Sequence, residues 1–338
     1  MGEGMVIRIR KMIAMLWALL VLHCVNIITV SAFDGARIEE NERLAIERMT
    51  RGFEGLEESI DLSDLNISTS SLSVLFSHAT KNTPYLFYVD KRLTYTYRGD
   101  TVIKVMPKYN MTKEEANTAI GFCKAEVGKM AELILVGESE LERMILAHDL
   151  ICSRYKYDLS LESNNIYKFI KEGKGTCQGY TWTYMALLRE VGIECEYVAS
   201  DSIDHIWLRV KLDGDWYNSD VTWDDPVGNE GNGTQICRNH LLFSDVEADR
   251  DGYRDRYGAS GNKCTSEKYD GVDLSDLVSP DHTAGDVNHD GAVGLADLVA
   301  LRLCKRVCPI CADIDVDMAF SEGDINALRH FILTKSYE

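Results

Sequence analysis

The stretch from residue 175 to residue 226 constrains the fold most, because it encodes a helix and then a β-hairpin. Apolar residues recur at helical spacing between positions 180 and 191, and Gly192 follows as a typical helix stop. This pattern predicts a helix that begins near Cys177. A cysteine at that place lies beside unpaired backbone N–H groups, which favour a thiolate by roughly 0.3–1 kcal/mol.

The hairpin follows directly. Apolar and polar residues alternate from position 206 to position 212 as in a strand, the Asp-Gly pair at 213–214 is typical of a tight turn, and residues 216–221 form the return strand. This hairpin places His205 and Asp220 at the same end of the ladder, where the carboxylate can orient the imidazole. A helix and a hairpin in this order indicate a mixed α+β fold.

Several motifs in this stretch carry a family resemblance. They read G-x-C-x-G-Y from Gly175, D-H-x-W from Asp204, G-x-W-Y from Gly214 and D-x-T-W-D-D-P from Asp220. Together they resemble the transglutaminase-like superfamily, a group of papain-related thiol enzymes. The resemblance implies a papain-like core with Cys177 as nucleophile, His205 as general acid/base and Asp220 as orienting carboxylate. Residues 206–208 depart from the family, which commonly has Ala-Trp-Asn there. The glycines at 175 and 179 are expected to keep the approach to the thiol clear of side chains.

The first 32 residues have the pattern of a signal peptide. Three basic residues precede an apolar run from position 12 to position 30, and Val30-Ser31-Ala32 suits cleavage before Phe33. The mature protein is therefore expected to be secreted, with no membrane association after cleavage; an uncleaved anchor is the alternative. The chain carries 36 basic and 54 acidic side chains, a formal net charge of −18, which argues against nucleic acid and anionic membranes as partners.

The rest of the chain divides by pattern into four regions. Residues 33–110 form an N-terminal α+β region, residues 111–268 the catalytic core, residues 269–282 a linker and residues 283–338 a small all-α module. In the N-terminal region we expect helices over 37–60 and 62–79 and strands over 85–97 and 101–107, joined at Arg98-Gly99-Asp100. In the core we expect a helix from about Glu138 to Tyr155 and a short helix around 240–243, and we interpret His148 and His240 as structural.

The C-terminal module contains two acidic loops. Oxygen donors at alternate positions, a turn glycine and a carboxylate that opens the next helix are what a calcium loop requires. The expected ligands are Asp286, Asn288, Asp290, the carbonyl of Ala292 and Asp297 in the first loop, and Asp313, Asp315, Asp317 and Asp324 in the second. Apolar helices are expected over 298–303 and 325–333. In the second loop Met318 replaces the glycine, which costs on the order of 1 kcal/mol if that position has a positive φ.

Two EF-hand-like loops that both end in Asp resemble a type I dockerin. This resemblance implies binding of Ca²⁺ and of a cohesin domain on a scaffolding protein, and hence a place in an extracellular cellulosome. Partner choice would rest on residues 295–296 and 322–323, which differ between the two loops.

The ten cysteines leave two local questions open. Cys304, Cys308 and Cys311 cluster between the acidic loops, where a disulfide clip is favoured over a zinc site. Cys237 and Cys264 are a second candidate pair.

The sequence therefore predicts a secreted, cellulosome-associated cysteine hydrolase, a peptidase or amidase that acts on protein or peptide substrates without a catalytic cofactor. Two alternatives stay open. One is a transglutaminase that cross-links proteins, and the other is an inactive binding or structural subunit that accompanies polysaccharide-degrading enzymes.

Overall fold

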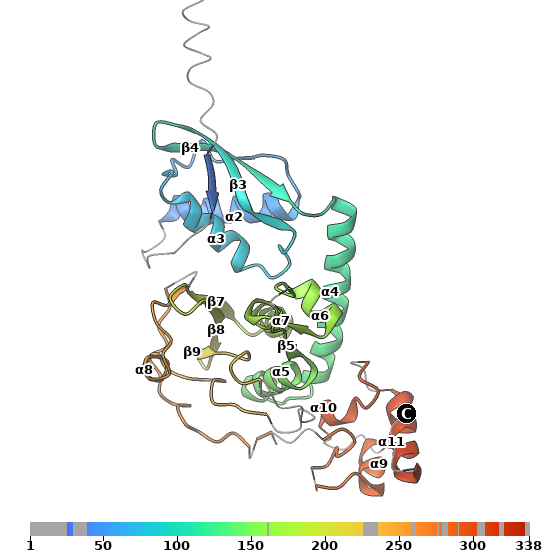
Figure 1. Cartoon of the computed structure of the whole chain (residues 1–338). Coiled ribbons are helices and arrows are strands. Elements are labelled where there is room, and N and C mark those ends of the chain that lie inside the picture. The colour runs from blue at the N-terminus through green and yellow to red at the C-terminus, as the bar shows by residue number, and fades with distance from the viewer. Residues whose placement is uncertain are drawn as a thin grey trace, which may run out of the picture. The chain divides into compact units, whose positions relative to one another are not determined.

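The computed structural model describes residues 26–29, 39–160, 162–225, 236–258, 261–275, 277–278, 283–289, 291–302, 308–317 and 321–334. The chain divides into two compact units, residues 1–114 and 115–338, and each is described by itself (Figure 1). The expected signal peptide lies outside the described residues, except for residues 26–29. Among the helices that the structure describes, none combines the length and the apolar character needed to cross a membrane.

The first unit pairs two helices with a four-stranded antiparallel sheet of order β1-β3-β4-β2. Its elements are β1 (Asn26–Thr29), α2 (Glu40–Glu54), β2 (Ile60–Asp61), α3 (Leu72–Lys81), β3 (Val89–Arg98) and β4 (Thr101–Tyr109). Gly99, with a φ of 62°, forms the turn between β3 and β4, as the sequence predicts. Phe53 of α2 and Phe76 of α3 meet edge to face, with ring centroids 5.6 Å apart, in the core of this unit.

The second helix of this unit is shorter than predicted, because the residues before it line the edge of the sheet. Ile60 pairs with Val105, and the N–H of Val102 donates to the carbonyl of Ile67 at 2.8 Å. These contacts satisfy backbone groups that a helix over 62–71 would have used internally. The helix therefore begins only at Leu72.

The second unit contains a four-stranded antiparallel sheet of order β10-β7-β8-β9 and a short parallel pair, β5 with β6. Its elements up to residue 258 are α4 (Lys113–Ile134), α5 (Glu140–Arg154), β5 (Lys156–Tyr157), α6 (Ile166–Glu172), β6 (Lys174–Gly175), α7 (Cys177–Glu190), β7 (Cys195–Ser200), β8 (His205–Leu212), β9 (Asp215–Ser219), α8 (Asp245–Arg250) and β10 (Tyr257–Gly258). Helix α7 packs against β8 and α5 (Figure 1). The predicted helix start at Cys177 and the predicted hairpin are both confirmed.

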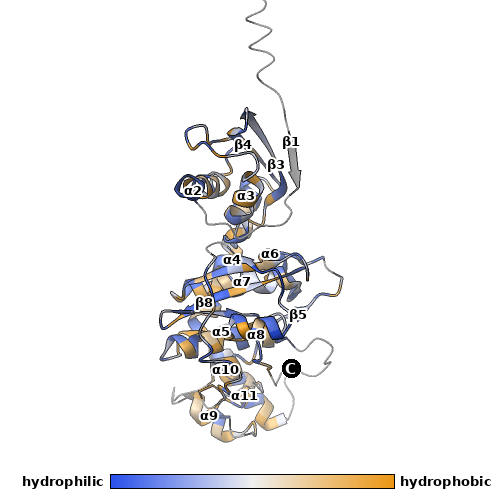
Figure 2. Ribbon diagram, turned by 90° about the vertical axis from the view of Figure 1, so that its left-hand side faces the viewer, coloured by the Kyte–Doolittle hydropathy of each residue, from blue (hydrophilic) through white to orange (hydrophobic). Residues whose placement is uncertain are grey.

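Side-chain capping explains where α5 and α8 begin. The Ser139 side chain accepts from the N–H of Glu142, and the Glu142 side chain accepts from the N–H of Ser139, a capping box that starts α5. Figure 2 shows that α5 carries both hydrophobic and hydrophilic residues. The short helix predicted at 240–243 is wrong in position. It lies at α8, because the Ser244 hydroxyl accepts from the N–H groups of Val246 and Glu247 at 3.1 Å each.

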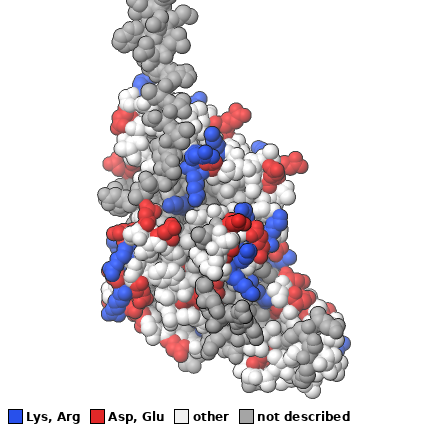
Figure 3. Space-filling model, viewed as in Figure 1, with Lys and Arg blue, Asp and Glu red and all other residues white. Residues whose placement is uncertain are grey.

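The last part of the second unit is helical. It contains α9 (Leu295–Arg302), α10 (Pro309–Ala312) and α11 (Glu322–Thr334). Helices α9 and α11 contact each other, and both begin three residues before the predicted positions. Acidic and basic side chains lie interspersed on the face of the molecule shown in Figure 3.

Candidate active site

The candidate nucleophile is the first residue of α7. Thr176 before it has an extended backbone, with φ of −89° and ψ of 178°, so the helix begins sharply at Cys177. The thiol is half-buried and is not in a disulfide. It therefore lies at the positive end of the helix dipole.

The hairpin delivers the other two predicted residues to one place. Leu208 pairs with Ser219, so His205 at the start of β8 and Asp220 directly after β9 lie at the same end of the ladder. Nε2 of His205 lies 2.6 Å from Oδ2 of Asp220, and the N–H of Thr222 donates to Oδ1 of Asp220 at 2.9 Å. Both oxygens of this buried carboxylate are thus held in place.

His205 also interacts with the Cys177 sulfur. Burial opposes protonation of the imidazole, but the Asp220 carboxylate and a hydrogen bond with Cys177 outweigh burial and raise the pKa of His205 to about 10. Because Asp220 occupies Nε2, Nδ1 is the nitrogen left for the thiol. The structure therefore brings Cys177, His205 and Asp220 together in the arrangement that thiol acyl transfer uses. Their catalytic roles stay predictions.

Two aromatic residues complete this arrangement: Trp223, which lies within the D-x-T-W-D-D-P motif, and Tyr253, which sequence analysis did not single out. The Tyr253 hydroxyl donates to Oδ2 of Asp220 at 2.8 Å, and its burial, then the nearby carboxylate, raise the pKa of Tyr253. The Trp223 ring stacks on the His205 imidazole with centroids 5.0 Å apart, yet 39% of Trp223 is exposed. Tyr253 lies 33 residues beyond Asp220, in a region without a motif, so no pattern in the sequence points to it.

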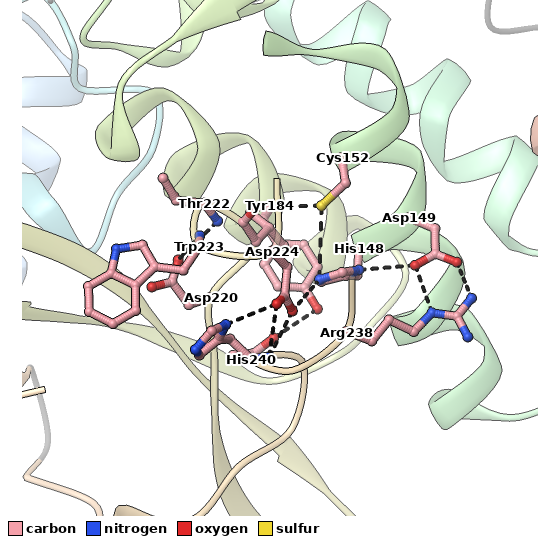
Figure 4. Close-up of polar contacts among 12 residues, drawn as sticks. His148, Asp149, Cys152, Tyr184, Asp220, Thr222, Trp223, Asp224, Arg238 and His240 are labelled. Carbon is pink, nitrogen blue, oxygen red and sulfur yellow. Dashed lines mark hydrogen bonds and ion pairs between the residues drawn. The ribbon is translucent and has the colours of Figure 1, made fainter. Parts of the chain in front are cut away.

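A second buried cluster lies beside the first, and Figure 4 shows its centre, His148. Nδ1 of His148 lies 3.0 Å from Asp149 Oδ1, and Nε2 lies 3.0 Å from Asp224 Oδ2. Burial opposes protonation, but Cys152 and the carboxylates of Asp149 and Asp224 raise the pKa of His148 well above its usual range. His148 therefore lies between two buried carboxylates that favour its protonated form.

Further groups balance these carboxylates. Arg238 binds Asp149 through two guanidinium nitrogens, and the Arg238 Nε contact measures 3.0 Å. Nδ1 of His240 lies 2.9 Å from Asp224 Oδ1. Burial would raise the pKa of Asp224, but the hydrogen bonds with His148 and His240 hold that pKa below its usual value. Both histidines interpreted as structural therefore belong to one buried ionic network.

The network connects directly to the hairpin end that carries Asp220. The Asp220 N–H donates to the His240 carbonyl at 2.7 Å, and the Trp223 ring meets the His240 ring edge to face at 5.6 Å. The Cys152 thiol donates to the carbonyl of Val221 at 3.4 Å. Residues 220–224 are thus held by the network on one side and by His205 on the other.

The two glycines near the thiol have a packing role that the sequence did not reveal. A Cβ on Gly179 would come within 2.6 Å of the Phe169 ring, and one on Gly175 within 2.4 Å of it. Phe169 of α6 also stacks on Tyr155 at 4.3 Å. These glycines therefore allow α6 to pack closely on α7, and their expected effect on the approach to the thiol stays a prediction.

The two acidic loops share one hydrogen-bond pattern. In the first, Asp297 Oδ1 accepts from the N–H of Val287 at 2.9 Å and Oδ2 accepts from Gly294 at 2.8 Å. In the second, Asp324 Oδ1 accepts from Ile314 at 2.7 Å and Oδ2 accepts from Ser321 at 2.8 Å. Both terminal aspartates are fully buried, so each fixes the course of its loop.

The other expected ligands converge in the second loop, whereas those of the first loop differ in burial. Carboxylate oxygens of Asp313, Asp315 and Asp317 lie within 4.8 Å of one another, a spacing that fits a hard cation. In the first loop Asp286 is buried and Asn288 and Ala292 are exposed, while Asp290 lies outside the described residues. Gly291 has a φ of 84°, which supports the need for glycine there; its counterpart Met318 also lies outside the described residues.

The pairing considered for Cys237 and Cys264 is not found. Both are free thiols in the structure. The Cys264 N–H donates to Asp245 Oδ2 at 3.0 Å, whereas Cys237 lies close enough to Asp224 for that carboxylate, after burial, to raise the pKa of Cys237. The two cysteines thus belong to different surroundings.

Comparison with known proteins matches part of the core to a family. Residues 130–221 match the family model described as the transglutaminase-like superfamily, and this segment contains Cys177, His205 and Asp220. A solved structure described as "Crystal structure of a TGase" matches at 15% identity with a TM-score of 0.30, over 41% of this chain and 45% of that chain. The search of curated proteins found no match. Residues 130–221 of this mixed helix and sheet protein are therefore a domain of the transglutaminase-like superfamily.

Proposed function

We propose that this chain is a thiol acyl-transfer enzyme that hydrolyses amide bonds in protein or peptide substrates. The observation that carries the proposal is the 2.6 Å contact between His205 Nε2 and Asp220 Oδ2, at a hairpin end where the imidazole also interacts with Cys177. An imidazolium beside a thiol at a helix N-terminus is the arrangement that stabilises a thiolate at neutral pH.

The reaction proceeds in two halves. The Cys177 thiolate attacks the amide carbonyl and forms a carbon–sulfur bond, and the His205 imidazolium gives its proton to the nitrogen as the carbon–nitrogen bond breaks. A free amine leaves and a thioester remains on Cys177. His205, now neutral, takes a proton from water as the water attacks the thioester. The carboxylic acid product leaves and the thiolate is restored.

The alkylation rate of Cys177 tests the pair of thiolate and imidazolium without knowledge of the substrate. We expect rapid reaction with iodoacetamide at neutral pH, measured at Cys177 by peptide mass spectrometry, and a fall of about 100-fold in His205→Ala. Cys237→Ser is the matched control and should leave the rate unchanged. Equal rates in the parent and His205→Ala, rising only under alkaline conditions, would refute the proposal.

The acceptor is tested separately. An unfolded protein substrate is incubated in isotopically labelled water together with a labelled primary amine. Hydrolysis places the label from water in new carboxylates, whereas a cross-linking transglutaminase places the amine on glutamine side chains. Label from the amine alone would replace the hydrolase by a transglutaminase. If Cys177 is reactive but the substrate gains label from neither the water nor the amine, the result would favour an inactive binding subunit.

We also propose that the tail, residues 283–338, is a type I dockerin that binds Ca²⁺ and a cohesin domain and places the secreted enzyme in a cellulosome. The shared hydrogen-bond pattern of the two loops and the convergence of Asp313, Asp315 and Asp317 support this. Bound Ca²⁺ would be held by these carboxylates together with Asp324 in the second loop and by Asp286, Asn288 and Asp297 in the first.

A panel of type I cohesins tests this assignment. We expect one or more to bind the full chain in Ca²⁺ and to dissociate in a chelator, with Cys177→Ala binding as well as the parent. Asp297→Ala with Asp324→Ala should abolish binding, whereas Asp273→Ala, an exposed acid outside the loops, should retain it. Calcium-independent binding, or none across the panel, would count against the dockerin.

A further inference from the structure

A second kind of ligand cluster lies next to the first acidic loop. One ring nitrogen of His289 and the sulfur atoms of Cys308 and Cys311 lie within 4.8 Å of one another. Both cysteines are buried, His289 is partly buried, and neither cysteine is in a disulfide. The sequence had grouped both cysteines with Cys304, but the histidine lies well before them in the chain and was not connected with them.

We propose that His289, Cys308 and Cys311 form a zinc site, distinct in chemistry from the two acidic loops. Thiolate sulfur and imidazole nitrogen are the donors that Zn²⁺ prefers, whereas Ca²⁺ takes oxygen ligands almost exclusively. Two thiolates and a neutral imidazole balance the charge of one Zn²⁺, and water completes the tetrahedron. Two thiol protons are released on binding, and no electron is transferred.

The backbone already holds the two cysteines against the loop. The Cys308 N–H donates to the carbonyl of Val287 at 3.0 Å, and the Gly285 N–H donates to the carbonyl of Cys311 at 2.8 Å. These two bonds hold residues 285–287, directly before His289, against the cysteine pair. The ligand set is therefore preorganised, and the ion needs to order little chain when it binds.

A local hydrogen bond suits a metal-bound thiolate. The Cys311 N–H points at the Cys308 sulfur at 3.5 Å, within the range for a bond to sulfur. Such outer contacts orient a ligand and stabilise its negative charge. The carboxylates of Asp149 and Asp224 around His148 are another candidate set of metal ligands. Arginine and histidine side chains already balance the charge of those carboxylates, so that cluster does not call for a metal.

The second acidic loop shows which part of this geometry is specific. Val316 occupies the place that corresponds to His289, with a φ of 62° against 54° for His289. The positive φ therefore belongs to the course of both loops and is not itself evidence for a ligand. What distinguishes the first loop is an imidazole at this position together with the neighbouring cysteine pair.

The experiment uses the full chain with Cys177→Ala, so that the candidate nucleophile cannot bind metal, in mild reductant and excess Ca²⁺. Titration with Co²⁺ should give one equivalent of binding, with thiolate-to-metal charge transfer in the near ultraviolet and the visible bands of a tetrahedral ion. Zn²⁺ should displace the Co²⁺ spectrum. Because this variant cannot perform acyl transfer, the outcome is independent of the proposed catalytic function.

Substitutions locate the site. Cys308→Ser and Cys311→Ser should each reduce the charge-transfer band to about half or less, and His289→Ala should weaken Zn²⁺ binding by about tenfold or more. Cys237→Ser and His330→Ala, which remove a thiol and an imidazole elsewhere in the same unit, should bind as the parent does. The proposal fails if the parent shows no charge-transfer band, if His289→Ala binds unchanged, or if Cys308 and Cys311 stay disulfide-bonded in reductant.

Discussion

Tyr253 donates its hydroxyl proton at 2.8 Å to Oδ2 of Asp220, the same carboxylate oxygen that contacts His205 Nε2 at 2.6 Å. One oxygen thus serves both the imidazole and a buried phenol. The Asp220 carboxylate cannot rotate away from His205 without losing a charge-assisted hydrogen bond in a dry environment, where such bonds are strongest. Tyr253 is therefore a positioning residue for the predicted triad.

Tyr253→Phe should lower kcat by about tenfold and leave KM unchanged, because the orienting bond acts on the triad and not on substrate contacts. Loss of the phenol should also shift the alkaline limb of the pH profile, which the raised pKa of His205 sets. Tyr257→Phe is the control, since the Tyr257 hydroxyl donates to Asp201 at 2.7 Å, away from the triad. An unaltered kcat and pH profile in Tyr253→Phe would rule out this role.

The raised pKa of His205, about 10, predicts the pH range of the proposed activity. The imidazolium that protonates the leaving amine persists below this value, so kcat should fall as pH rises through about 10. The same pair stabilises the fold fully below the ordinary pKa of 6.5, and that contribution is lost as pH rises through about 10. A kcat profile that already declines near pH 7 would contradict this shift.

His148→Gln should destabilise the second unit by about 3–5 kcal/mol, because it leaves Asp149 and Asp224 buried without their shared cation. Urea unfolding followed by tryptophan fluorescence measures this, since four of the five tryptophans, Trp182, Trp207, Trp216 and Trp223, belong to that unit. His78→Gln in the first unit should leave this transition unchanged. A loss below about 1 kcal/mol would show that the network contributes little.

The same network predicts opposite pH effects for its two kinds of group. The raised pKa of His148 gives stability that is complete below its ordinary pKa of 6.5 and is lost as pH rises through the raised value. The lowered pKa of Asp224 gives stability that is present above its ordinary pKa of 3.8 and is lost as pH falls through the lowered value. The free energy of unfolding of the parent should therefore be highest near neutral pH and fall on both sides. In His148→Gln the fall on the alkaline side should be absent.

Gly179→Ala should destabilise the second unit by about 1–3 kcal/mol, because the new methyl group would meet the Phe169 ring at 2.6 Å. Gly121→Ala in α4 offers the matched helical control, since nothing lies within 4 Å of its Cβ position. That change should stabilise by about 0.5–1 kcal/mol through helix propensity. Equal effects of the two substitutions on the urea midpoint would contradict the packing assignment.

Removal of Ca²⁺ should open the tail to proteolysis, because metal binding and folding are coupled in loops built from carboxylates. In chelator we expect trypsin to cut within residues 283–334 while the core persists as a stable fragment. Excess Ca²⁺ should restore protection, and Mg²⁺ should restore less, since it demands a smaller and stricter coordination sphere. A tail that resists trypsin equally with and without chelator would contradict calcium-dependent folding.

The sequence predicted those parts of the site that local patterns encode. The helix start at Cys177 follows from apolar spacing and Gly192, and the hairpin follows from the Asp-Gly turn at 213–214, so the register that joins His205 to Asp220 was available from the chain alone. Ser244 with Glu247 three residues later is also a capping pattern, and reading it would have placed α8 correctly.

The missed residues depend on contacts between distant segments. Tyr253 reaches Asp220 across 33 residues, and Arg238 reaches Asp149 across 89, so no periodicity or spacing encodes either pair. The helix expected from Leu62 failed for a related reason. Its first residues instead bond to β4, and tertiary pairing of this kind overrides a local helical pattern.

The two acidic loops can be compared with each other within one chain. Compared position by position, they differ at 291 and 318, glycine against methionine, and at 289 and 316, histidine against valine. They have kept Asp297 and Asp324, whose carboxylates receive the same set of backbone donors. Each loop therefore has the same carboxylate anchor for its backbone, while the side chain three residues after the first acidic position differs, so the proposed zinc ligand His289 occurs in the first loop and not in the second.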